Sequence, residues 1–107
     1  IQIDGVSLLS DAYLLLFKAK AWLDLSVRKK LGGNVDGRDI KKHKNDVFRL
    51  SALLSPTLKV DIQGEVKNDL VEFINACKDD ITDPKSLGLS GLSQSDILER
   101  IKISFGI

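Results

Sequence analysis

Apolar residues recur at helical spacing along most of the chain, and these runs predict helices separated by short polar or glycine-containing links. The predicted helices cover residues 11–31, 37–54, 64–81 and 93–105. Together they predict an all-α, four-helix bundle-like fold, with residues 1–107 forming a single helical domain. Residues 1–6 alternate weakly between apolar and polar, so one short N-terminal strand is an alternative for these residues.

Residues with helix-capping chemistry lie at the predicted boundaries. Ser10 is the N-cap candidate of the first helix, and the second helix has two candidates, Asn34 and Asp36. Ser93, with Asp96 three residues later, resembles a capping box at the start of the last helix. The link between the first two helices is short and rich in glycine, so we expect these helices to form an antiparallel hairpin.

The first predicted helix is apolar on nearly all sides, which is typical of a helix in the middle of a bundle or against another domain. The third helix places Cys77 on its apolar spacing, so we expect a buried, unreactive thiol. With one cysteine and one histidine, the chain can form neither an internal disulfide nor a usual zinc ligand set.

Composition places the chain among folded single domains, with 107 residues, 43% hydrophobic and 29% charged. No apolar run approaches the roughly 20 residues of a membrane helix, and no basic leader begins the chain. We therefore expect a cytoplasmic protein without membrane contact. Because the chain has no methionine, not even at its start, we interpret it as a piece of a longer protein.

Positive charge is concentrated in one segment of a nearly neutral chain. Residues 26–49 carry eight basic and three acidic side chains, a local net charge of +5, whereas the whole chain carries +1. Such a segment suggests a patch for phosphate or for an acidic partner. A solvated helix end and turn would give the same pattern. No nucleophile elbow, Walker loop, dinucleotide fingerprint or paired-histidine zinc motif accompanies it, so nucleophilic catalysis has no specific support.

The second predicted helix carries polar residues on and beside its apolar stripe. His43 lies inside the stripe, which consists of Ile40, His43, Val47, Leu50 and Leu54. A polar column runs along it, formed by Asp39, Lys42, His43, Asp46 and Arg49. An unpartnered buried carboxylate is costly, so Asp46 needs a cation or hydrogen-bond donors.

Lys18 interrupts an apolar row of the first helix much as His43 interrupts the second, since Leu14, Ala21 and Leu25 share its face. The expected hairpin would bring Lys18 to the region of His43 and Asp46. Two interpretations remain open. The residues either form a site for phosphates or a metal-bound nucleotide, or they are a snorkelling lysine and a polar pair that fixes helix register.

At these residues the chain also resembles a known family. The stretches LLLFKAKAWLDL (residues 14–25) and RDIKKHKNDVFRLSALL (residues 38–54) resemble the C-terminal helical part of nucleotidyltransferase-like proteins of the abortive-infection toxin type. In that family a leucine-rich helix with a lysine precedes a helix with an Asp-x-x-Asp-like motif. Lys18 matches the lysine, and Asp46 matches the helical aspartate, with Asp39 as the other choice.

The resemblance implies a role in binding or transferring nucleotide phosphates. Its implied catalytic residues are Lys18 and Asp46, with Asp39, Lys42, His43 and Arg49 as substrate-binding residues and no metal ligands. The family's metal site lies in an N-terminal sheet with a Gly-Ser and paired acidic residues, and no such segment is present. The resemblance therefore implies that this fragment holds no cofactor and is inactive alone. Its partner would be an N-terminal catalytic domain that uses Mg²⁺ and a nucleoside triphosphate.

Two other functions fit the same residues. The first is a non-enzymatic helical module for protein–protein interaction, which docks a partner on the apolar first helix. The second is nucleic-acid binding through residues 26–49, although Phe48 is the only aromatic residue there, which argues against base stacking.

Overall fold

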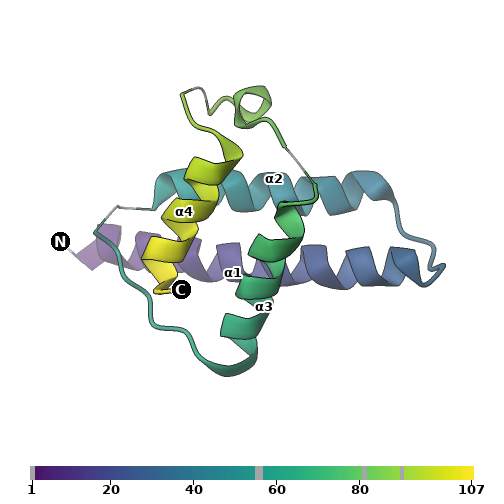
Figure 1. The fold of residues 1–107 in the computed structure, drawn as a ribbon. Helices are drawn as coiled ribbons and strands as arrows, with labels where there is room; N and C mark the ends of the chain where they lie inside the picture. The colour runs from purple at the N-terminus through teal and green to yellow at the C-terminus, as the bar shows by residue number, and fades with distance from the viewer. Residues whose placement is uncertain (1, 55–56, 81, 90) are drawn as a thin grey trace.

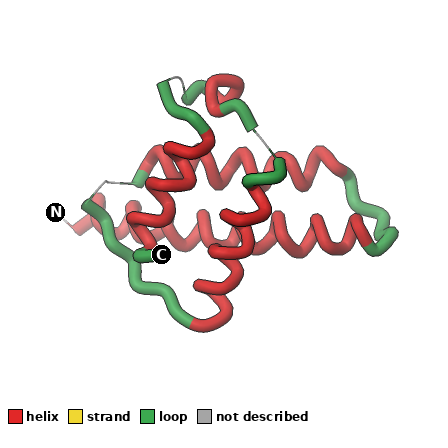
Figure 2. The backbone as a smooth tube through the Cα atoms, in the orientation of Figure 1, coloured by secondary structure: helices red, strands yellow, loops and turns green. Residues whose placement is uncertain are grey.

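The computed structural model describes the chain except for residues 1, 55–56, 81 and 90, and it describes residues 2–9 by their backbone alone. The described residues form four α-helices and one 3₁₀ turn (Figure 1), and Figure 2 shows no β-strand among them. The elements are α1 (Gln2–Lys30), α2 (Gly37–Leu53), α3 (Gly64–Cys77), the 3₁₀ turn η1 (Pro84–Leu87) and α4 (Gln94–Phe105). The all-α prediction is therefore confirmed. None of the described helices has the length and apolar character needed to cross a membrane.

Helices α1 and α2 form the expected antiparallel hairpin, joined by a six-residue link (Figure 1). After α1, Gly32 adopts a left-handed conformation (φ +87°), and the Gly33 N–H donates to the Arg28 carbonyl at 2.9 Å. A Cβ at Gly33 would lie 2.8 Å from that carbonyl oxygen, so this close approach requires glycine. Asp36 is the N-cap of α2, because its carboxylate accepts a hydrogen bond from the Arg38 N–H at 2.8 Å.

The two remaining helices cross the hairpin, α3 against α1 and α4 against α2 (Figure 1). The capping box at the start of α4 is confirmed: the Ser93 hydroxyl accepts from the Asp96 N–H, and the Asp96 carboxylate accepts from the Ser93 N–H. The link before α3 is fastened to α4, because the Val60 N–H donates to the Ser104 carbonyl at 2.8 Å. The link after α2 is thereby tied to the last turn of α4.

The hydrophobic core fills the space between the hairpin and the crossing helices. Phe73 of α3 meets Trp22 of α1 edge to face, with ring centroids 5.3 Å apart. Because α2 contacts both α1 and α4, a wide arc of its surface is buried, including Phe48 as well as the predicted stripe residue Val47. The fully buried apolar side chains are Ala12, Leu15, Val47, Phe48, Leu70, Phe73, Cys77, Ile97 and Ile101.

Two predicted helix boundaries are wrong, and the strand considered for the first residues does not form among residues 2–6. Residues 2–6 belong to α1 and form no strand, and Ser10 therefore lies inside the helix. A helix satisfies its backbone hydrogen bonds internally, whereas a lone strand leaves them unpaired. Helix α3 ends at Cys77 because the chain tightens there, with the Asp80 N–H donating only three residues back, to the Cys77 carbonyl. The predicted end of this helix, Ile81, lies outside the described residues.

Candidate functional site

Lys18 and Asp46 meet between the two helices of the hairpin. The Lys18 ammonium lies 3.3 Å from Asp46 Oδ2, and Arg49 Nη1, one turn further along α2, lies 3.9 Å from Oδ1 of the same carboxylate. The Lys18 and Asp46 side chains are about three-quarters buried, whereas about half of Arg49 is exposed. Asp46 thus has the cationic partner that its position requires. Because both groups still reach water, the pair contributes about 1 kcal/mol or less to stability.

A cleft of about 310 Å³ opens beside this ion pair. Its walls are leucines from both helices together with the charged groups: Leu14, Lys18, Asp46, Arg49, Leu50 and Leu53. Two cations and one carboxylate leave the cleft with a formal charge of +1. Such a cleft can receive a negatively charged group attached to an apolar body, because charge and apolar surface lie side by side in it.

The other predicted site residues do not join this arrangement. Asp39 and Lys42 are exposed, and neither forms an ion pair with another residue that the structure describes. His43 is half-buried and does not line the cleft. Its Nδ1 atom is buried without a hydrogen-bond partner among the described residues. The structure therefore brings together three of the six predicted residues, Lys18, Asp46 and Arg49.

The most deeply buried charged side chain among the described residues is Lys44, which our sequence analysis did not single out. Lys44 is only 1% exposed. Its ammonium donates to the backbone carbonyl of Asp80, lies 3.5 Å from Asp80 Oδ2, and lies 5.6 Å from the centre of the Phe48 ring. The sequence contains a signal for this position, because Lys44 interrupts the row Ile40–Lys44–Phe48 just as Lys18 interrupts its own row.

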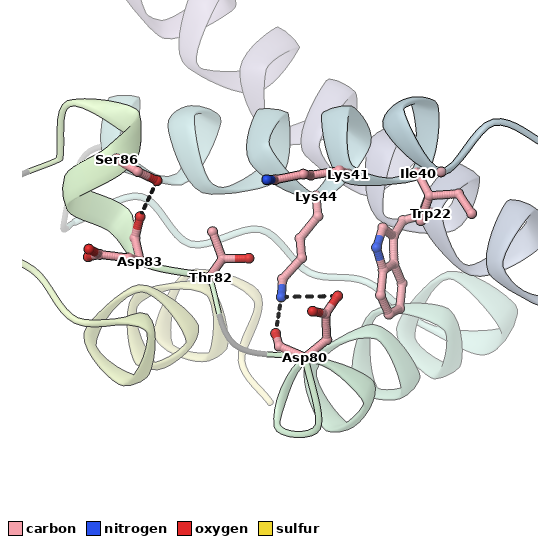
Figure 3. A pocket seen from close by; sticks show the side chains of 9 residues that line it. Trp22, Ile40, Lys41, Lys44, Asp80, Thr82, Asp83 and Ser86 are labelled. Atoms are coloured by element: carbon pink, nitrogen blue, oxygen red, sulfur yellow. Dashed lines mark hydrogen bonds and ion pairs between the residues drawn. The ribbon is translucent and has the colours of Figure 1, made fainter.

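A pocket of about 360 Å³ lies beside Lys44. Figure 3 shows the Lys44 side chain extending from α2 to Asp80, between Trp22 on one side and Thr82 on the other. Three separate parts of the chain contribute to its wall: α1, the first two turns of α2, and a third part that supplies Asp80, Thr82, Asp83 and Ser86. Lys44 therefore holds the end of α3 against α2 and at the same time forms part of the pocket wall.

Cys77 is buried, as predicted, and burial raises the pKa of its thiol from the ordinary value of 9.0 to about 12. We therefore expect the native thiol to resist iodoacetamide at pH 8 and to react once urea unfolds the chain.

Between pH 9 and 12 the native state holds the proton of the Cys77 thiol while the unfolded state loses it, so the free energy of unfolding should fall as pH rises through that window. Urea unfolding at several pH values, compared between the wild type and Cys77→Ala, measures this slope. A native thiol that reacts with iodoacetamide as fast as the unfolded one would contradict the expected resistance of the buried thiol.

In the described part of the chain, no group of three or more His, Cys, Asp or Glu side chains is placed to hold a metal ion. No protein-family model matches the chain, and comparisons with curated proteins and with solved structures found no match either. The resemblance to nucleotidyltransferase-like proteins therefore remains a prediction, and proposals about function must rest on the residues themselves.

Proposed function

We propose that this chain is a helical interaction domain that binds an amphipathic helix carrying a carboxylate. The observation that supports this proposal is an exposed apolar surface, called here the α1 face, which consists of Tyr13, Leu14 and Phe17 of α1 and Leu53 of α2. Leu14 and Leu53 also line the cleft beside the Lys18–Asp46 ion pair. The apolar surface therefore continues directly into a charged cleft.

The grouping of apolar residues on the α1 face matters more than the exposure of any one residue, because single exposed apolar side chains are common. Tyr13 is 61% exposed and Phe17 is 65% exposed, and they lie one helical turn apart on α1. Leu14 lies three residues before Phe17, so it borders the same surface. Aromatic and large apolar residues gathered in this way are typical of the buried centre of a protein interface.

The charge of the cleft indicates the kind of partner. Lys18 and Arg49 share a single carboxylate, that of Asp46. A partner helix would lay leucine-sized side chains against the α1 face, as amphipathic helices do in apolar grooves. A glutamate or aspartate at the edge of that helix would meet Arg49, whose side chain is about half exposed.

A selection from a displayed library of helical peptides tests this proposal. The selected peptides should carry leucine-sized residues at helical spacing with an adjacent glutamate or aspartate. Replacing that acidic residue by lysine should weaken binding at least about tenfold in fluorescence anisotropy, because a like charge would then face Arg49. Selected sequences that show no acidic preference would contradict the proposed partner chemistry.

Two matched variants of the chain locate the binding surface. Phe17→Asp places a charge in the α1 face and should abolish peptide binding, whereas Val66→Asp places the same charge on an exposed position of α3 and should leave it unchanged. Both residues are exposed, so neither change should affect folding strongly. Equal loss of binding in both variants would refute the α1 face as the docking surface.

A second candidate function is the binding of nucleotide phosphates, which the resemblance implies. It is favoured by the approach of Lys18 to Asp46 at 3.3 Å, since these are the two residues that the family motif matches. It ranks second because a phosphate carries more negative charge than a single carboxylate, so Asp46, which contacts both cations, would repel it more strongly. Titration with Mg²⁺–ATP, followed by NMR, separates the two functions: shifts centred on Lys18 and Arg49 would favour phosphate binding.

A further inference from the structure

We propose that the pocket beside Lys44 binds a small organic carboxylate with a short apolar body. This inference goes beyond the interaction domain proposed above, because no residue that lines this pocket lines the Lys18–Asp46 cleft. The residues around the pocket are Trp22, Gly37, Ile40, Lys41, Lys44, Asp80, Thr82, Asp83 and Ser86. The two binding functions can therefore fail or succeed independently.

The hydrogen-bond donors around the pocket are not matched by acceptors. Trp22 is 94% buried, and its Nε1–H has no hydrogen-bond partner among the described residues. Figure 3 shows this nitrogen on the side of the indole that faces Lys44. The Lys41 ammonium forms no ion pair within the described part of the chain. Lys44 has three ammonium protons and two contacts with Asp80, which leaves it able to donate once more.

Each carboxylate of the wall has a partner other than Lys41. The Asp80 carboxylate faces the Lys44 ammonium at 3.5 Å. The Asp83 carboxylate accepts from the Lys85 N–H at 3.1 Å, and Figure 3 shows it pointing away from Lys44. The Asp83 backbone carbonyl accepts from the Ser86 hydroxyl. The Trp22 Nε1–H and the Lys41 ammonium therefore favour a ligand with acceptor oxygens, and a carboxylate brings two that suit ammonium and indole donors.

The apolar part of the wall and the size of the pocket define the rest of the ligand. The Trp22 indole and the Ile40 side chain stand on the same side of Lys44 in Figure 3 and offer an apolar surface. A volume of about 360 Å³ lies at the small end of ligand-binding pockets. The fitting ligand is thus a carboxylate on a body of about the size of one aromatic ring.

The carboxylate would enter the pocket on the side of the lysines, and the apolar body would lie against Trp22 and Ile40. The indole nitrogen of Trp22 has no hydrogen-bond partner among the described residues and faces Lys44, so a carboxylate seated in the pocket changes its surroundings. Trp22 is the only tryptophan of the chain, so its indole N–H gives a single, assignable NMR signal that reports on this event.

Titrating the ¹⁵N-labelled chain with benzoate tests the proposal. We expect a saturable shift of the Trp22 indole signal with benzoate at millimolar concentration. Benzyl alcohol, which has the same ring and no charge, and benzylammonium, which has the opposite charge, should produce no such shift. Acetate, which lacks the apolar body, should bind more weakly than benzoate.

A pair of lysine variants shows whether the shift arises in the pocket. Lys41→Gln should weaken benzoate binding about tenfold, the effect of losing one charged hydrogen bond. Lys67→Gln removes the same charge from an exposed position of α3 and should leave binding unchanged. Both lysines are exposed, so both variants should fold.

Four results would overturn the proposal: no saturable shift at tens of millimolar benzoate, equal shifts with benzyl alcohol, equal affinities of the two lysine variants, or inorganic phosphate binding as tightly as benzoate. The last result would show that the pocket recognises charge alone. None of these measurements involves the α1 face, so failure here would leave the peptide-binding proposal intact.

Discussion

Replacing Lys44 with alanine is expected to lower the free energy of unfolding by about 3 kcal/mol. The lysine is almost completely buried, so alanine would leave a cavity where its four-carbon stem packs. The change would also leave the Asp80 carbonyl without its donor. The Asp80 carboxylate is 61% exposed and can turn to water, so loss of the ion pair itself should contribute little.

Urea unfolding of Lys44→Ala, Lys44→Met and Lys41→Ala separates the contribution of the buried stem of Lys44 from that of its ammonium. Lys44→Met keeps most of the buried stem and removes the ammonium, and we expect a loss of about 1 kcal/mol. Lys41→Ala changes an exposed lysine on the same helix and should alter stability by about 0.5 kcal/mol or less. If Lys44→Ala proved as stable as Lys41→Ala, the Lys44 side chain would have to reach solvent instead of the core.

Replacing Phe73 with alanine is expected to destabilise the fold by about 3–5 kcal/mol, the range measured for large aromatic residues in cores. Phe73 is fully buried and packs edge to face against Trp22, so it joins α3 to α1. The loss combines the transfer of the ring from the core with the cavity that remains. The near-ultraviolet circular dichroism of Trp22 should weaken at the same time, because its aromatic neighbour is gone.

Val66→Ala is the matched control for Phe73→Ala, because Val66 lies on the same helix and is 46% exposed. We expect this variant to lose about 0.5 kcal/mol or less and to keep the tryptophan signal. A Phe73→Ala variant that unfolds at the same urea concentration as Val66→Ala would show that α3 is not held on α1 by this aromatic pair.

The parts of the fold that were predictable from sequence depend on local chemistry. Asp36 and the Ser93–Asp96 box cap their helices through bonds to backbone groups two or three residues away, and such bonds are encoded by neighbouring residues. The length of α1 was harder to predict, because an alternating start such as residues 1–6 is compatible with a strand when its partners are unknown. Tertiary contacts decide such cases.

The part of the candidate site that lies between α1 and α2 could be predicted from the sequence. Lys18 was expected to reach the region of His43 and Asp46 because Lys18 and His43 interrupt apolar rows on adjacent helices, and Lys18 does contact Asp46. Lys44 was missed because it stands among polar neighbours, in KKHKND, and because its partner Asp80 lies 36 residues away beyond another helix. Only the position of α3 across the hairpin reveals that this lysine is enclosed.

The six-residue link of the hairpin also bears on how the chain folds. Contacts between α1 and α2 can form after closure of this short loop, whereas the bonds from Lys44 to Asp80 and from Val60 to Ser104 close much longer ones. Loop closure costs more conformational entropy as loops lengthen, and long-range contacts slow folding. Early formation of the hairpin is therefore the pathway of least entropy loss, and α3 and α4 then dock on a surface that already exists.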